Sequence, residues 1–514
     1  MSFVHDNTLG WIAGQKGWPT RTQALPSAPD HRPLSLYIGI ITANPPVLSP
    51  LLRDLGKLAT YSRIKRLAVV VLDNACPGES LASTVAAAKA LPLEIAVVTV
   101  AQQSLDASRG AFGARLRERR QGQLSIATAR TMLQRYLGEM MKPDTDAFGW
   151  LLDDDMRVDD RARWYLSWLP AFRENGIDVL IGACEGVSPN PPLHGVQCRL
   201  FDLLHNMTWL QNLPVSALLP DRSPDNAALR ARFPDYYYDL SRKHSEHLSL
   251  PFWVEPASEG EPVSAAYTRL ITEAHDILRG APLTRPLIAS IPTNPLEAAI
   301  DSVNRGGHTF VLNHRALTMT PNAALRLGTR EMRRSDMLWA IINRHYRRMK
   351  IKAVAFPVVH VGLANNAAAL DIEKVQAELM GAAVYAALVE FLREKPHHAL
   401  EFSAAEIQEV SMMTLRHRDQ RLEDLRISLT RIVELRESLR QIARGNELDC
   451  LLADLDAVFT SETFSQICCG VLSSQADDVG LLVSSLRTIT DDYASATPLD
   501  IGSLRSHLVS GAAT

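Results

Sequence analysis

The sequence predicts an α/β fold in which a helix-covered sheet is followed by an α-helical region. Between about residues 34 and 366, short β-rich runs alternate with segments of helical spacing, as in a sheet flanked by helices. From about residue 367 the composition changes to Ala, Leu, Glu and Arg with few Gly or Pro, which favours helices. At 514 residues, the chain is long enough for two or three domains.

The predicted elements follow one another in a regular order. Seven β-rich runs are expected to form strands, and the alternation with helices points to a parallel sheet. The runs are residues 36–42, 66–74, 94–101, 147–152, 176–186, 306–313 and 352–362, and the helices are 49–62, 80–91, about 125–141 and one that starts near Ser335. Residues 108–123 are basic and expected to be flexible, and the Pro- and aromatic-rich region 188–262 includes a stretch too irregular to assign.

A stripe of apolar residues runs through the predicted helical region. Its members recur at steps of three and four, which places them on one face of a helix. They are Leu422, Leu425, Leu429, Ile432, Leu435, Leu439 and Ile442. The stripe indicates either a helix of an intramolecular bundle or a coiled coil that forms a homodimer, and the sequence leaves both open.

Charge and composition exclude some classes of function. The 54 basic and 57 acidic residues give a formal net charge of −3, so no basic footprint predicts nucleic-acid binding. The amino terminus has no signal-like pattern and no segment approaches about 18 apolar residues, so we expect no transmembrane segment and a cytoplasmic location. The six cysteines have no C-x-x-C spacing and are expected to be reduced thiols.

Three adjacent carboxylates end the fourth predicted strand, in FGWLLDDDMRVD, residues 148–159. In an extended chain Asp153 and Asp155 would point the same way, about 7 Å apart, with Asp154 opposite. Two such charges repel by roughly 2–3 kcal/mol at an effective dielectric near 20, a penalty that a divalent cation removes. Because open α/β sheets bind ligands at the carboxyl ends of strands, the triplet predicts a metal site, with solvated helix-capping aspartates as the alternative.

Two other acid-rich motifs fit this stretch less well. A haloacid-dehalogenase-like phosphatase needs Asp-x-Asp-x-Thr/Val after its first strand, whereas Arg157 stands two residues beyond Asp155 and the strand is about the fourth. A prenyl-synthase-like Asp-Asp-x-x-Asp lies on a helix of an all-helical chain, and here Asp159 follows at the wrong interval. Neither class is predicted.

The order of several short motifs resembles the GT-A type nucleotide-sugar glycosyltransferases, close to the large inverting family that contains many bacterial polysaccharide enzymes. LYIGIITANPP is similar to the opening strand and nucleotide-facing turn, AVVVLDNACP to the second strand, and LSIATARTMLQRYL to the following helix. WLLDDDMRVD matches the Asp-x-Asp motif, GGHTFVLNHRAL the acceptor-side strand, REMRRSDMLWAIINR the helix that carries the base, and VVHVG the late histidine. The resemblance covers about residues 35–365 and implies a GT-A-like (Rossmann-like) mixed sheet.

Carried over residue by residue, the resemblance implies a donor site. The residues implied to bind the nucleotide are Thr42, Asn44, Asp73, Arg130 and Asp153. Those implied to hold Mn²⁺ or Mg²⁺ are Asp155 and His360, and Asp336 is the implied catalytic base. The second strand departs from the family by continuing as DNACPGES, and the Gln-x-x-Arg-Trp signature of processive members is missing. A soluble, hexosyltransferase-like enzyme that transfers one sugar, or a few, is therefore expected.

The implied reaction moves a sugar from a UDP- or GDP-sugar to a hydroxyl of an unknown acceptor, with inversion if the transfer is one in-line displacement. The implied domains are a leader at 1–33, a glycosyltransferase domain at 34–366 with an acceptor-side insertion at 188–262, and a helical domain at 367–514. Asp336 follows Ser335 at an expected helix start, so helix capping is its structural alternative, and His360 has a structural alternative too. An inactive glycosyltransferase-like scaffold and a nucleotidyltransferase also stay open.

Overall fold

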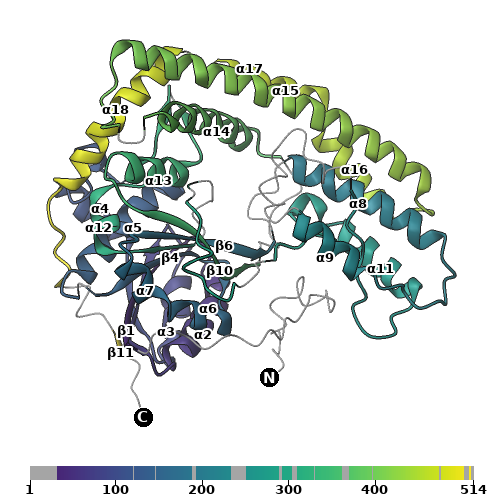
Figure 1. The fold of residues 1–514 in the computed structure, drawn as a ribbon, viewed down its shortest axis with the longest axis horizontal. Helices are drawn as coiled ribbons and strands as arrows, with labels where there is room; N and C mark the ends of the chain where they lie inside the picture. The colour runs from purple at the N-terminus through teal and green to yellow at the C-terminus, as the bar shows by residue number, and fades with distance from the viewer. Residues whose placement is uncertain are drawn as a thin grey trace.

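The computed structural model describes residues 32–510 except 120, 145, 188–192, 233–249, 289–291, 302, 304–308, 329, 362–369, 396–397, 474–475 and 503–508. Nine strands in this part of the chain form one sheet in the order β11-β3-β2-β1-β4-β7-β6-β10-β5 (Figure 1). They are β1 (Leu34–Thr42), β2 (Ile64–Asp73), β3 (Glu94–Val98), β4 (Phe148–Asp153), β5 (Met156–Arg157), β6 (Val179–Gly186), β7 (Thr309–Leu312), β10 (Ile351–His360) and β11 (Val509–Ser510). A small hairpin pairs β8 (Arg326–Leu327) with β9 (Arg330–Glu331).

The sheet is mixed, as the resemblance implies. Strands β1, β2, β3 and β4 run parallel, and β6 runs parallel to β10. Strand β7 is antiparallel to both of its neighbours, β4 and β6. All seven predicted strands are present, so the predicted α/β class with a mixed, helix-flanked sheet is confirmed.

Two predictions about local structure need correction. The third strand ends at Val98, because the Thr99 side chain accepts a hydrogen bond from the Gln102 amide and caps helix α4 (Val100–Ser108). The stretch 108–123, expected to be flexible, makes defined contacts: the 3-10 helix η2 (Ala114–Leu116) begins where the Ala114 amide donates to Asp492. Tertiary partners far away in sequence order this segment.

Each face of the sheet is covered by its own set of helices. Alternate residues of β1, such as Leu36 and Ile38, pack on one face with α2 (Pro45–Ala59), α3 (Ser80–Ala88), α6 (Asp160–Leu166) and α7 (Leu169–Glu174). The other face packs against α5 (Ile126–Met141), α12 (His314–Met319) and α13 (Ser335–His345). Helix α5 lies close to β1 because Gly39 has no side chain; a Cβ there would come 2.4 Å from Leu137 Cδ1.

The helical region shares its packing with the rest of the chain. It contains α14 (Ile372–Arg393), α15 (Ala404–Ile442), α16 (Asp449–Val458), α17 (Ser461–Leu472) and α18 (Ala476–Ala494). The 39-residue α15 runs along one side of the molecule, from above the sheet to α8 (Figure 1). Val410 and Leu425 join the core on the sheet face that α5 covers, whereas Ile432, Leu435 and Leu439 join a second core with α8 and α16.

All seven residues of the predicted apolar stripe lie in or against these two cores. The stripe is therefore covered by the chain itself, as the bundle alternative predicts. A homodimer through this seam is not supported.

Region 188–262 contains more regular structure than its composition indicates. Its described part and the following residues form α8 (Leu193–Gln211), α9 (Ser223–Arg232), α11 (Val263–Ala274) and the 3-10 helix η4 (Ile277–Arg279). The aromatic stretch around residue 236 lies outside the described residues.

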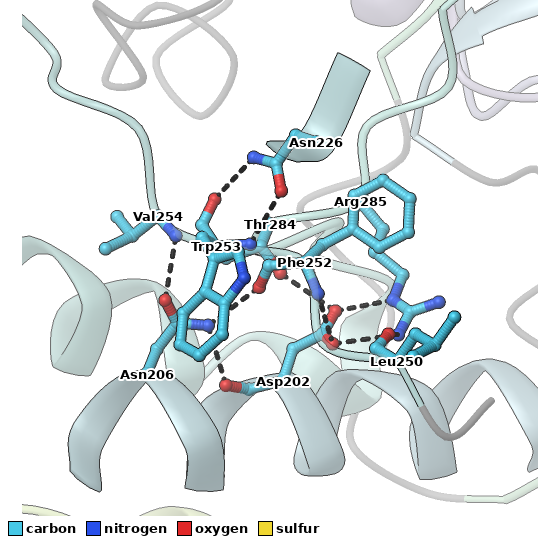
Figure 2. Close-up of polar contacts among 9 residues, drawn as sticks. All are labelled: Asp202, Asn206, Asn226, Leu250, Phe252, Trp253, Val254, Thr284 and Arg285. Carbon is cyan, nitrogen blue, oxygen red and sulfur yellow. Dashed lines mark hydrogen bonds and ion pairs between the residues drawn. The ribbon is translucent and has the colours of Figure 1, made fainter. Parts of the chain in front are cut away.

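Two asparagines hold an extended segment of this region, residues 252–254 (Figure 2). Asn226 accepts from the Trp253 amide and donates to the Trp253 carbonyl, both at 2.8 Å. Asn206 accepts from the Val254 amide and donates to the Phe252 carbonyl, also at 2.8 Å. Both asparagines are fully buried. The two side chains therefore satisfy backbone N–H and C=O groups that a neighbouring strand would bond in a sheet.

One described helix, α14, is long and apolar enough to cross a membrane by length and composition. The pair 449–472 and 476–494 passes the same test only when taken together, across a bend of 59°. In α14, 61% of the most apolar window is buried inside the molecule, so packing accounts for its composition.

Candidate active site

The predicted site residues meet at one edge of the sheet. Parallel pairing places Thr42 beside Asp73 and Ile41 beside Asp153, where β1, β2 and β4 end. His360 arrives at the end of β10, which pairs with β5 immediately after the three aspartates. Residues from 42 to 360 of the chain are thus brought to one place.

The three aspartates take three different partners. Strand β4 ends at Asp153, and a turn at Asp154 and Asp155 leads to β5, so the predicted extended geometry of the triplet is wrong. Asp153 accepts from Arg130 Nη2 at 2.9 Å, and Asp154 accepts from the Thr42 hydroxyl at 2.7 Å. A distance of 2.9 Å joins Asp155 Oδ2 to His360 Nε2.

The turn is fixed by contacts on both sides. Arg157 binds the buried Asp54 of α2 through two hydrogen bonds, Nε to Oδ2 at 2.6 Å and Nη2 to Oδ1 at 3.0 Å. The Val361 amide donates to the Asp155 carbonyl at 3.1 Å. Arg157, which separates this sequence from the phosphatase motif, thus anchors the strand that follows the triplet.

Arg130 links the nucleotide side of the site to the predicted base. Its side chain is only 9% exposed, and Nη1 lies 4.0 Å from Asp336 Oδ2 while Nη2 binds Asp153. Asp336 lies in the first turn of α13. Ser335 does not cap the helix, because Arg334 occupies the N-cap position in the left-handed conformation (φ 71°) and no side chain makes a capping hydrogen bond. The other part of the structural alternative holds, since an acidic side chain in the first turn favours the helix dipole.

The ring of His360 is held from both sides. Nδ1 lies 2.8 Å from the Val187 carbonyl, which can only accept, so Nδ1 carries a proton. Nε2 faces Asp155 Oδ2 at 2.9 Å, and in the neutral ring its lone pair would bind a metal in place of this contact.

The donor set fits a divalent cation that is shared with a substrate. No group of three or more His, Cys, Asp or Glu that could hold a metal ion occurs in the part of the chain that the structure describes. With a cation bound, Asp155 and His360 would supply one oxygen and one nitrogen and would leave the remaining positions open. Sites that hold Mg²⁺ through one or two protein ligands complete its shell with phosphate oxygens and water.

Burial and mutual repulsion shift the titration of these groups. Burial raises the pKa of Asp153, partly opposed by Arg130. Burial, with the charges of Asp155 and Asp153, raises the pKa of Asp154 to about 7 against the hydrogen bond from Thr42. Burial lowers the pKa of His360, but the charge and hydrogen bond of Asp155 outweigh it, so the net direction is upward. The cluster is one whose negative charge a bound cation would stabilise.

The remaining predicted nucleotide residues flank this cluster. Thr42 is almost fully buried, with its hydroxyl turned to Asp154, and it also accepts from the Asn44 amide at 3.2 Å. The Asn44 side chain makes no capping hydrogen bond to α2. Asp73 accepts from the Cys76 amide at 2.8 Å, which fixes the turn after β2. Of these three residues, Thr42 uses its hydroxyl to donate a hydrogen bond to Asp154.

A set of contacts beside Asp73 was not anticipated. Asn74 bonds both backbone groups of Leu124, donating to the carbonyl at 3.1 Å and accepting from the amide at 2.7 Å. Gln103 donates to the Asp73 carbonyl and accepts from the buried Arg119 at 2.8 Å. The chain before α5 is thereby held over the end of β2. The available signal was an asparagine as the last residue of the predicted strand 66–74.

Glu185, at the end of β6, lies in a second buried charge network. It accepts from both terminal nitrogens of Arg161, at 2.9 and 2.6 Å, and is only 2% exposed. Arg161 also pairs with Asp159 at 2.6 Å. Strand pairing places Glu185 opposite Val359, next to His360. The network supports the wall of the site.

Comparisons with known proteins give a distant likeness in structure. No protein-family model matches the chain, and no curated protein matches it. Mannosyltransferase PcManGT from Pyrobaculum calidifontis, in complex with GDP-Man and Mn²⁺, is similar at 10% identity and a TM-score of 0.35 over 95% of both chains. TarS 1–349 from S. aureus is similar at 11% identity and a TM-score of 0.29, over 88% of this chain and 92% of that one. Likeness at this level carries no information about substrate, metal or activity.

Proposed function

We propose that this protein transfers a sugar from a nucleoside-diphosphate sugar to an acceptor hydroxyl, with a divalent cation and inversion of the anomeric centre. The observation that carries the proposal is the position of Arg130, which lies between Asp153 and Asp336 at the edge that also holds Asp155 and His360. A nucleotide-side carboxylate, an acidic base and a pair of metal ligands therefore adjoin one another. A metal-dependent, inverting transfer from a nucleotide sugar would use these three parts.

The metal site consists of Asp155 and His360, which would hold Mn²⁺ or Mg²⁺. A cation held there would neutralise negative charge on the donor diphosphate. The hydrogen bond to the Val187 carbonyl orients His360 for this role. Asp73 and Asp153 face the nucleoside, and the buried Arg130 donates toward the same side of the site.

Asp336 takes the proton of the acceptor hydroxyl. The hydroxyl oxygen forms a bond to the anomeric carbon as the bond from that carbon to the phosphate oxygen breaks, and its electron pair leaves with the nucleoside diphosphate. A general base contributes about 10²–10⁴-fold to such a step. The Asp336 side chain is 15% exposed, so an acceptor can reach it.

Nucleotide release tests the proposal. The full-length protein is incubated with UDP-, GDP-, CDP- and dTDP-sugars, with Mn²⁺ or EDTA. We expect one donor to release its nucleoside diphosphate only with the metal present, since water can replace the missing acceptor. Asp155→Asn should raise the Mn²⁺ requirement, and Asp336→Asn should lower the rate by about 10²–10⁴-fold. Asp160→Asn is the matched control, because Asp160 is an exposed aspartate five residues after Asp155 that pairs with Arg163 of its own helix, α6.

Three results would contradict the proposal. Absence of nucleotide-sugar binding, with folding intact, would favour an inactive scaffold. Release of pyrophosphate instead of a nucleoside diphosphate would identify a nucleotidyltransferase. Full activity of Asp336→Asn would place the base elsewhere.

A further inference from the structure

A group of basic residues lies directly beside the proposed base. Arg333 and Arg334 precede α13, and both pair with Glu378 of α14, Arg333 Nε at 3.3 Å from Oε2 and Arg334 through Nη2. The backbone of this segment rests on α14, where the Arg333 amide donates to the Ala377 carbonyl at 3.2 Å. Gly381 makes the approach possible, because a Cβ there would come 2.1 Å from the Arg333 carbonyl oxygen.

Two further cations adjoin this group without a bound counter-charge. Lys374 lies one turn before Glu378 on α14, and Arg421 lies on α15, which packs against α14. Within the described residues, neither the Lys374 ammonium nor the Arg421 guanidinium forms an ion pair or hydrogen bond; Lys374 is exposed and Arg421 half-buried. Burial and Arg334 lower the pKa of Arg421, although Glu378 and Asp424 oppose them.

The group and the base share one face of α14. Lys374, Glu378, Gly381 and Tyr385 follow one another at steps of four, three and four, which places them on one side of the helix. The Tyr385 hydroxyl, which donates to the Val303 carbonyl at 3.2 Å, feels the charges of both Arg334 and Asp336. The face of α14 that carries Lys374 therefore also carries Glu378, which pairs with Arg333 and Arg334 beside Asp336.

We infer that Lys374 and Arg421, with the Arg333–Arg334 pair, form a binding site for an oxyanion, a phosphate or carboxylate group of the acceptor. The assignment to the acceptor rests on the proposed function, because the site adjoins Asp336 rather than the nucleotide side. Arginine recognises planar oxyanions through two parallel hydrogen bonds, and lysine adds a point charge. An arginine that is half-buried without an ion pair or hydrogen bond, as Arg421 is among the described residues, costs stability, which is a pattern found where a residue serves a ligand.

Anion binding is measured on the full-length protein without a nucleotide sugar. Thermal unfolding is followed in sodium phosphate, sodium acetate and sodium chloride at matched pH and ionic strength. Phosphate or acetate should raise the melting temperature above the chloride value, and the stronger of the two identifies the anion. Arg421→Ala should weaken the apparent affinity about tenfold, as expected for loss of a charge-assisted hydrogen bond. Arg426→Ala, which removes an exposed cation of the same helix paired with Glu423, should leave it unchanged.

The stability of Arg421→Ala in chloride separates a ligand-binding arginine from a structural one. We expect this variant to melt no lower than Arg426→Ala. A melting temperature well below that control would make Arg421 a structural residue and overturn the inference. So would an unchanged anion effect in Arg421→Ala, or no effect of either anion on the wild type. An effect kept by Arg421→Ala but lost in Arg130→Ala would place the anion on the donor side. Failure of sugar transfer would instead appear as absence of nucleotide release.

Discussion

The buried ion pair between Asp202 and Arg285 gives the sharpest test of the packing in region 188–285. Arg285 donates to Asp202 through Nε at 2.5 Å and Nη2 at 2.8 Å, and the two side chains are 1% and 0% exposed (Figure 2). Asp202 also accepts from the Thr284 hydroxyl at 2.9 Å and the Phe252 amide at 3.0 Å. The pair thus joins α8 to two segments that follow it.

Arg285→Met should destabilise this region by about 3–5 kcal/mol. The substitution preserves much of the apolar stem but leaves the Asp202 carboxylate buried with two neutral donors, and removal of one partner from a buried pair costs about that much. Arg285 also donates to the Leu250 carbonyl at 2.9 Å, which would lose this donor. Replacing both charged residues, Asp202→Leu with Arg285→Met, removes the uncompensated charge. The double variant should therefore be no less stable than the single one.

Hydrogen exchange of the α8 amides measures the local free energy of opening. The control is Arg279→Met, which breaks an exposed pair with Asp276 at 2.7 Å and should cost at most about 1 kcal/mol. If the α8 amides were as well protected from exchange in Arg285→Met as in Arg279→Met, the Asp202 charge would not be left uncompensated, and the electrostatic reasoning would be wrong. A double variant far less stable than the single one would show that the polar contacts matter more than the charge.

Three further changes have defined outcomes. Gly186→Ala should lower the melting temperature and weaken the rise of that temperature with Mn²⁺, because Gly186 has a φ of 87° and a Cβ would come 2.4 Å from the His360 carbonyl oxygen. Gly260→Ala is the control, because Gly260 has a φ of 77° but no atom near the added Cβ, so this variant shows the effect of backbone strain alone. Asn74→Ala should speed tryptic cleavage at Arg115 and Arg117 severalfold, since both hydrogen bonds to Leu124 are lost, whereas unchanged cleavage would show that Asn74 does not hold this segment. Hydrogen bonds from Lys395 and from Ser403 lower the pKa of Glu406 to about 2, so its contribution is present above the unfolded pKa and lost as the pH falls toward 2. Glu406→Gln should thus destabilise α15 by about 1 kcal/mol at pH 7 but not near pH 2, while Glu409→Gln has no effect at either pH in urea unfolding.

Much of the fold was predictable because its signals are local. Alternating β-rich and helical runs identify the strands, and parallel strands bring their carboxyl ends together regardless of their separation in sequence. That rule alone places Asp73 and Asp153 at one edge, as the register with β1 confirms. Strand β7 could not be oriented in the same way, because antiparallel insertion into a parallel sheet depends on a long connection that periodicity does not describe.

The partners of the three aspartates could not be predicted from spacing. An extended chain has a period of two, but the chain turns after Asp153, and the turn is fixed by Arg157 binding Asp54, 103 residues earlier. Thr42 and His360 reach Asp154 and Asp155 only because β1 and β10 flank this turn. The same limit applies to Arg334: no propensity predicts that an arginine, rather than Ser335, occupies the N-cap of α13. Tertiary contacts decide such details.

The long helix α15 connects the core on one face of the sheet with the core around α8. At 1.5 Å per residue its 39 residues span about 58 Å, and its apolar stripe divides between the core on the α5 face of the sheet and the core with α8. Arg421 lies next to the point where the stripe passes from one core to the other, at Leu425 and Ile432. The region built around Asp202 therefore reaches the proposed base through a single continuous helix, and it is expected to move relative to the sheet only if α15 bends or one of its two cores loosens.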